Sequence, residues 1–175
     1  MNQLSLKHIV TTCLVFFLFA CGQNDFPNNY PEKIKELPLG MEVLHNPEEV
    51  YATVNTKDPE KWGAYQLQFT TSVKAISEDL EIIEFGGYIW ENEQWEFRSI
   101  YDRPFNTEEF NKWYGCENGI LKKDKTYSDT DNWMGKTNYL SGREIKSLWY
   151  FIAKNDAGEK FVGAQEIVGY VKLAE

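Results

Sequence analysis

The 175-residue sequence has few of the residues that most enzymes use for chemistry. It contains three cysteines and two histidines, and it has no nucleophile-elbow, zinc-protease, P-loop or dinucleotide-binding motif. His8 lies in the N-terminal leader described below, so only His45 remains for the folded protein. A single histidine cannot build a zinc site of the usual His and Cys kind or, without an evident nucleophile, a catalytic triad. The sequence therefore predicts a protein that is not an enzyme and that holds no metal or cofactor.

Basic residues are also in the minority. The chain has 18 lysines and arginines against 27 aspartates and glutamates, which gives a formal net charge of −9 at pH 7. Nucleic acid and anionic lipid headgroups repel such a protein, and no basic stripe interrupts the acidic composition. Nucleic acid is therefore not expected as a partner, and the charge is interpreted mainly as a source of solubility.

No apolar run in the sequence is long enough to cross a bilayer as a helix, which takes about 20 residues. The run from Ile9 to Phe19 follows Lys7 and His8 and precedes the small residue Ala20. A short positive start, an apolar core and a small residue before the cut are typical of a secretory signal peptide. We therefore expect residues 1–20 to be removed from the mature protein.

The residues around the expected cut resemble the lipobox of bacterial lipoproteins. They are Leu18-Phe19-Ala20-Cys21, in which Phe19 is bulkier than the usual occupant. The resemblance implies that Cys21 is lipidated and becomes the acylated N-terminus, and several acyl chains together give a stable membrane anchor. Gly22, and not aspartate, follows the cysteine, which favours the outer membrane. The implied location is the cell envelope, facing either the periplasm or the exterior.

The mature chain is expected to form one domain on a tether. Residues 21–40 comprise the lipidated cysteine and a segment with three prolines and several asparagines, which is the composition of an extended linker. Residues 41–175 have the size of a single β-rich domain. Cys13 leaves with the signal and Cys21 carries lipid, so Cys116 has no partner for an internal disulfide. We expect Cys116 to be buried as a small apolar residue.

Strand-like alternation and turn signals dominate the rest of the chain. An Asn-Pro-Glu-Glu start predicts a short helix over residues 47–54, with His45 just before it at the surface. Three strands are expected to form a meander, with a bulge or bend at Gly86-Gly87, and a long polar loop is expected over residues 122–137. The strands span residues 64–76, 80–90 and 95–99, and further short helices are expected at 58–63 and 106–115.

The C-terminal part predicts a β-hairpin, with strands over residues 144–154 and 160–173. Within it, the run Trp149-x-Phe151-x-Ala153-x-Asn155-x-Ala157-Gly158 resembles the last hairpin of fibronectin type III domains. The likeness covers this run alone. Together with the other strands, it favours a mainly β fold, either an antiparallel immunoglobulin-like sandwich or a barrel, with short helical insertions.

Two groups of acidic residues invite a chemical interpretation. Asp129-Thr130-Asp131-Asn132 begins like a calcium loop, but Trp133 occupies the fifth position and no glutamate follows at the required distance. Glu91, Glu93 and Glu96 lie close in sequence, as a glycosidase pair can, although among 27 acids such proximity is expected by chance. We interpret the first group as a solvated loop and the second as solvent-exposed residues near a turn.

Aromatic residues are numerous, with 11 phenylalanines, 10 tyrosines and 6 tryptophans. Most of them are expected in the core, because sheets bury aromatic rings well. Four lie where a core need not reach, and they are the candidate ligand-binding residues: Trp62, Trp113, Tyr114 and Trp133. Flat rings beside carboxylates and amides suit a sugar ring or an extended peptide.

Three functions remain open for a lipid-anchored envelope protein of this kind. The first is a non-catalytic binding or assembly module for an envelope protein, which requires an exposed apolar patch on a sheet face or edge. The second is a glycan or small-ligand binding protein, which requires a concave site lined by Trp113 or Trp133. The third is an envelope hydrolase, which requires two converging carboxylates with different proton affinities.

Overall fold

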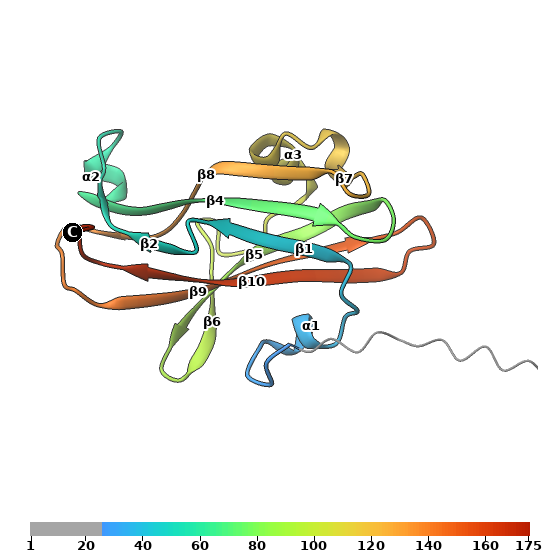
Figure 1. Ribbon diagram of the computed structural model, residues 1–175, viewed down its shortest axis with the longest axis horizontal. Coiled ribbons are helices and arrows are strands. Elements are labelled where there is room, and N and C mark those ends of the chain that lie inside the picture. Colours follow the sequence, from blue (N-terminus) through green and yellow to red (C-terminus); the bar gives the residue numbers. More distant parts are fainter. Residues whose placement is uncertain (1–25) are drawn as a thin grey trace, which may run out of the picture.

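The computed structural model describes residues 26–175, which form two packed β-sheets with a few short helices (Figure 1). The first sheet contains β1 (Met41–Asn46), β3 (Thr53–Val54), β4 (Tyr65–Ala75) and β8 (Thr126–Thr137). The second contains β2 (Glu49–Tyr51), β5 (Leu80–Glu91), β6 (Gln94–Arg98), β7 (Ile120–Leu121), β9 (Glu144–Lys154) and β10 (Lys160–Tyr170). The helical segments are α1 (Glu32–Lys35), α2 (Pro59–Trp62), α3 (Thr107–Tyr114) and the 3₁₀ turn η1 (Glu117–Gly119). The prediction of a mainly β fold with short helical insertions is confirmed.

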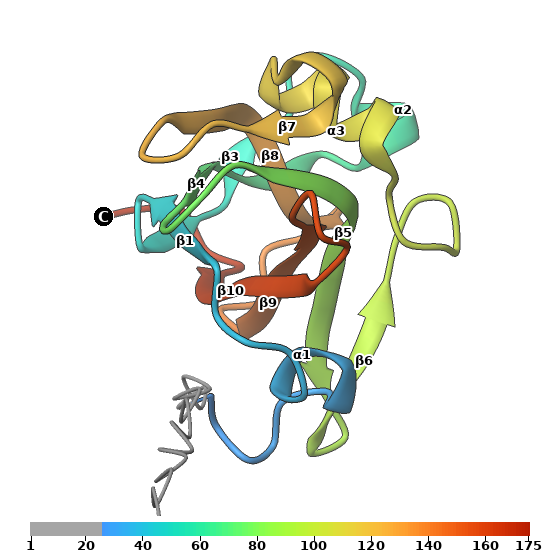
Figure 2. The ribbon, with the colours of Figure 1, turned by 90° about the vertical axis from the view of Figure 1, so that its right-hand side faces the viewer.

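The two sheets approach each other closely on one side only. β4 pairs with β8 along one edge and with β1 and β3 along the other, while the second sheet has the order β2-β10-β9-β5-β6. Where β10 runs beside β1, Gly163 permits the contact, because a Cβ there would lie 2.7 Å from the Cβ of Met41. β8 and β6 are the edges on the opposite side, where α3 lies close to both β5 and β8 (Figure 2).

The main core lies between the sheets and under α3. Phe85 of β5 is its centre, and its ring contacts five other aromatic rings: Phe105, Phe110, Trp113, Tyr114 and Phe151. Cys116 lies in the same cluster and is a free, buried cysteine, as expected. Such rings remove a large apolar area from water, and this burial stabilises the packing of α3 across both sheets.

Several sequence predictions agree with the structure. The strand expected over residues 64–76 is β4, and the C-terminal hairpin is β9 and β10, which pair along their whole length. The helix expected at 106–115 is α3: the Asn106 side chain accepts a hydrogen bond from the backbone N–H of Glu109, the Glu109 carboxylate accepts one from the backbone N–H of Asn106, and Gly115 ends the helix with a φ of 62°. Among residues 26–175, no helix is long and apolar enough to cross a membrane.

The extended linker expected within residues 21–40 is wrong for its second half. α1 forms there, and Tyr30 and Ile34 are buried on the outer face of the second sheet against β9 residues including Tyr150. Lys33 donates a hydrogen bond to the Tyr150 hydroxyl at 3.0 Å and pairs with Glu84 at 2.5 Å. The physical reason is that β9 is apolar on both faces, so its outer face also needs a cover.

The helix expected over residues 47–54 is also wrong, because β2 and β3 occupy this segment. β2 pairs in parallel with β10, and this tertiary pairing outweighs the local helix-start signal. The surface position expected for His45 is wrong for a related reason. His45 belongs to β1, whose side chains alternate between buried and exposed, and it shares the buried face with Met41 and Val43.

The expected three-stranded meander is wrong in its pairing. β5 and β6 form a hairpin, but β4 belongs to the other sheet, so the chain crosses between sheets after Ala75. The register shift in β5 lies between Ile82 and Glu84 and not at Gly86-Gly87. The polar loop expected over residues 122–137 is largely the strand β8, which pairs with β4.

Candidate ligand-binding cleft

A cleft of about 1020 Å³ opens on the side of the molecule where the sheets separate. β8 supplies one wall, β5, β6 and the segment that follows β6 supply the other, and β9 supplies the floor. α2 and α3 each contribute a tryptophan. This volume is at the upper end of the usual range for ligand pockets.

The floor is the inner face of β9. Ile145, Ser147 and Trp149 alternate along the strand, so all three point to the same side, and all three line the cleft. Gly87 of β5 pairs with Trp149, and a Cβ at Gly87 would lie 3.6 Å from the indole ring. A larger residue at Gly87 would therefore extend over the indole and fill part of the floor.

Two bulges shape the β8 wall. Thr71 pairs with Asp129 and Phe69 with Asn132, so β8 carries one extra residue over this stretch. A second shift lies beside Gly135, whose φ of +59° is in the left-handed region that favours glycine. Bulges bend a strand and redirect its side chains. Here they turn the segment from residue 129 to residue 135 towards the cleft.

A buried chain of hydrogen bonds fixes the first bulge. The Asn132 amide donates to the Thr71 hydroxyl at 2.6 Å, and His45 Nδ1 lies 3.1 Å from the same hydroxyl. His45 Nε2 lies 3.2 Å from the backbone carbonyl of Gln165. The Gln165 carbonyl can only accept a hydrogen bond, so Nε2 of neutral His45 carries the proton. Nδ1 then accepts the hydrogen bond that the Thr71 hydroxyl donates. Burial lowers the pKa of His45 to about 4 and so keeps the imidazole neutral.

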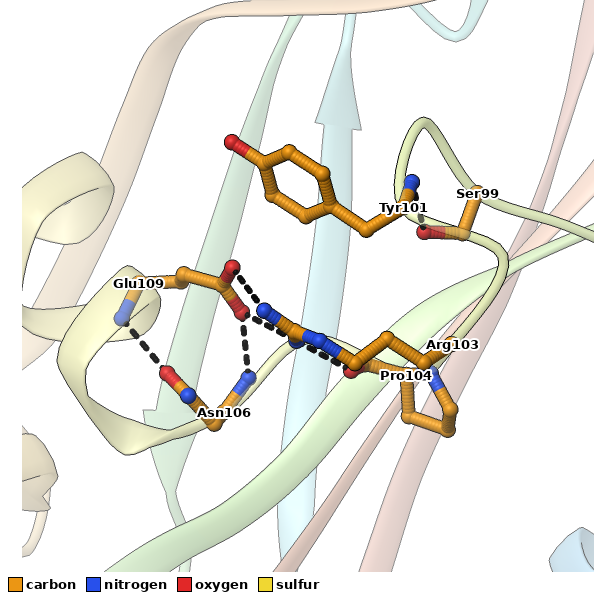
Figure 3. A network of polar contacts seen from close by, with 6 residues as sticks. All are labelled: Ser99, Tyr101, Arg103, Pro104, Asn106 and Glu109. Atoms are coloured by element: carbon orange, nitrogen blue, oxygen red, sulfur yellow. Dashed lines mark hydrogen bonds and ion pairs between the residues drawn. The ribbon is translucent and has the colours of Figure 1, made fainter.

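The opposite wall includes the segment from Ser99 to Phe105, which projects between β6 and α3 (Figure 2). Its anchor is Arg103, whose two terminal nitrogens bind the two carboxylate oxygens of Glu109 at 2.8 and 2.9 Å (Figure 3). The same guanidinium donates to the Pro104 carbonyl at 2.8 Å. The ion pair lowers the pKa of Glu109, and Tyr101, 51 % exposed, is held over the Arg103 guanidinium.

Three of the four candidate residues come together in this cleft. Trp62 and Trp133 are edge-to-face partners with centroids 5.7 Å apart, and Trp113 packs against Phe105 at 4.7 Å. Tyr114 does not line the cleft. It is buried in the core, and this burial raises the pKa of its hydroxyl well above the usual value.

Sequence reasoning missed five aromatic residues of the cleft: Trp90, Phe97, Tyr101, Phe105 and Trp149. With them, five of the six tryptophans of the chain line this one site. The strand position of Trp149 predicts burial in the core, and the alternation of β9 does point it inward. The separation of the sheets at this side, which no local pattern reports, leaves it accessible from the cleft.

Of the two acidic groups of the sequence, Asp129, Asp131 and Glu91 line the cleft, whereas Glu93 and Glu96 are not among the lining residues. Asp129 lies at the β8 bulge, where burial raises the pKa of its carboxyl and the Asp131 N–H donates to it at 3.0 Å. Among residues 26–175, no group of three or more His, Cys, Asp or Glu side chains is placed to hold a metal ion. Glu91 and Glu96 both pair with Arg98, at 2.9 and 2.7 Å.

The predicted lipidation site, Cys21, lies outside the described residues. No protein-family model, curated protein or solved structure matches the chain. The cleft is therefore interpreted from its own residues and geometry.

Proposed function

We propose that this protein is a lipid-anchored, non-catalytic binding protein of the bacterial cell envelope, and that its tryptophan-lined cleft holds a glycan segment or a small ring-shaped ligand. The observation that carries the proposal is the convergence of five tryptophans from five elements on one cleft of about 1020 Å³. Indole faces pack well against flat ligand rings, and neighbouring carboxylates and amides can accept and donate hydrogen bonds.

Both walls of the cleft are held by polar contacts, which favours a binding site over a chance exposure of core tryptophans. Arg103 and Glu109 fix one wall, and the hydrogen-bond chain from Asn132 to His45 fixes the other. A site that is held in shape before binding loses less conformational entropy when the ligand arrives.

The test is a fluorescence titration with a panel of oligosaccharides. The intrinsic tryptophan emission of the wild type should change on binding, and Trp113→Ala or Trp133→Ala should weaken the complex at least about tenfold, as removal of a stacked ring does. Tyr51→Ala is the control, because it removes a ring that stacks on Tyr170 and does not line the cleft. A complex that forms equally well without Trp113 and Trp133 contradicts the proposal.

The anchor at Cys21 is part of the proposal. Phe26, the first described residue, follows Cys21 by five positions, so an extended chain spans at most about 18 Å between them. A lipidated protein therefore carries this domain close to the bilayer surface. Membrane fractionation of Cys21→Ser tests the anchor, since a variant that stays as membrane-bound as the wild type excludes lipidation as the cause.

An envelope protein partner is the second candidate function. Four exposed apolar side chains lie around the ends of β3, β8 and β10, as docking requires: Val54, Tyr139, Leu140 and Leu173. Cross-linking in cells tests it, because an assembly module should recover one recurrent envelope protein that a Tyr139→Lys variant loses. The cleft ranks ahead of this surface because its walls are built and fixed.

A further inference from the structure

Acidic side chains outnumber basic ones among the residues that line the cleft. Among its lining residues, five carry carboxylates and two carry guanidinium groups. The carboxylates belong to Glu91, Asp102, Asp129, Asp131 and Glu144, and the guanidinium groups to Arg98 and Arg143. The cleft walls concentrate this field, so an anionic ligand is repelled and a cationic ligand is attracted.

The guanidinium group on the β6 side is already neutralised. Arg98 Nη2 lies 2.9 Å from a carboxylate oxygen of Glu91 and 2.7 Å from one of Glu96. An anionic ligand would have to displace two carboxylates to reach it. Arg143 is the other guanidinium group of the lining, and the five carboxylates outnumber it.

Among the described side chains, few cations compensate the carboxylates on the β8 side. No described lysine or arginine side chain forms an ion pair with Asp129, which is half-buried at the bulge. Asp131 pairs with Lys57 at 3.6 Å, and both side chains are largely exposed. For Asp129, partial withdrawal from water without a cation is unfavourable, and an incoming ammonium group would relieve this cost.

The aromatic rings of the rim already attract cations of the chain itself. Lys61 Nζ lies 4.6 Å from the centroid of the Trp62 ring, and the Arg103 guanidinium lies 5.1 Å from that of Tyr101. Ring faces of tryptophan and tyrosine are electron-rich and attract ammonium groups. Trp133 follows Asp131 by two residues, so one wall offers a ring face and a carboxylate side by side.

From these observations we infer that the cleft selects a cationic glycan, a short chain of sugar rings that carry free ammonium groups. The inference rests on the proposed function and names its ligand class. Each sugar presents a flat C–H face to a tryptophan while its ammonium group reaches Asp129 or Asp131. The volume of about 1020 Å³ accommodates several such rings.

Calorimetric titration at pH 6 with three tetrasaccharides tests the inference. Glucosamine tetramer should bind at least about tenfold more tightly than the uncharged N-acetylglucosamine tetramer, and galacturonate tetramer should bind most weakly. The double variant Asp129→Asn, Asp131→Asn should lose this preference, so that the cationic and the uncharged tetramer bind it with similar affinity. Asp156→Asn is the matched control, because Asp156 is an exposed acid in the turn between β9 and β10.

The outcomes separate the inference from the proposed function. Equal affinity for the cationic and uncharged tetramers, or tighter binding of the uronate, overturns the inference and leaves a glycan site in place. Trilysine that binds as tightly as glucosamine tetramer, with the same dependence on the two aspartates, overturns the sugar assignment. The proposed function itself fails if none of the three tetramers binds and the tryptophan emission stays constant.

Discussion

Acidification should destabilise this protein through His45. Its imidazole is buried in β1 with a pKa of about 4, whereas an unfolded histidine has a pKa of about 6.5. The folded state therefore binds fewer protons than the unfolded state between these two values. The stability contributed by neutral His45 is present above about pH 6.5 and is lost as the pH falls towards 4.

The size of the effect follows from the two pKa values. Between pH 7.5 and pH 5, protonation of the unfolded chain alone lowers the free energy of unfolding by about 2 kcal/mol. For a domain of this size, such a loss lowers the melting temperature by about 4–8 °C. Acidification should also loosen the β8 wall of the cleft, because the Nδ1 of a protonated His45 can no longer accept a hydrogen bond from Thr71.

The assay is urea unfolding at pH 7.5, 6 and 5 for the wild type and for His45→Gln. A glutamine amide can donate to the Gln165 carbonyl and accept from Thr71, yet it does not titrate. Other groups, such as Glu109 with its lowered pKa, also contribute to acid sensitivity, so the difference between the two proteins isolates His45. If both proteins lose the same free energy between pH 7.5 and pH 5, the assignment of His45 as a buried neutral group is wrong.

Three further predictions concern the bulge, the helix and the cysteine. Gly135→Ala and Gly158→Ala should each lower the free energy of unfolding by about 1–2 kcal/mol, because both glycines have positive φ. Only Gly135→Ala should also change the Trp133 emission, since a Cβ at Gly158 would have no neighbour within 4 Å. Asn106→Ala should lower the free energy of unfolding by about 1 kcal/mol and Asn106→Gly by only a few tenths, as measured by urea titration; equal losses would argue against a capping role. Burial raises the pKa of Cys116 to about 11, so a thiol reagent at pH 8 should label Cys116 slowly in the native protein and rapidly in denaturant; rapid labelling of the native protein would show that the thiol is exposed.

Local patterns predicted the elements whose stability is local. α3 was predictable because Asn106, Glu109 and Gly115 form a complete set of start and stop signals. The β9–β10 hairpin was predictable because its two strands are long and joined by a short turn. β2 was not predictable, since its start resembles a helix cap and only the parallel pairing with β10, over a hundred residues away, decides its conformation.

The aromatic residues of the cleft were also predictable only in part. Trp62, Trp113 and Trp133 were identified as candidates because each stands outside an expected core, and they line one cleft. Their mutual proximity was not predictable, because it depends on β8 pairing with β4 and on α3 crossing towards β5. Tyr114 was misassigned because it is the neighbour of Trp113 on a helix, where adjacent residues point in different directions.

One of the strands that sequence reasoning missed, β8, forms a wall of the site. In β8, the buried positions are Tyr127 before the first bulge and Asn132 and Met134 after it, so the alternation changes phase in the middle of the strand. A period of two is therefore interrupted, and the polar composition suggests a loop. The same interruption places Asp129, Asp131 and Trp133 along the cleft wall. A regular β8 would be easy to recognise from its sequence, but it would not present this combination of charged and aromatic side chains. The bulge is therefore the cause both of the irregular sequence pattern and of this wall of the candidate site.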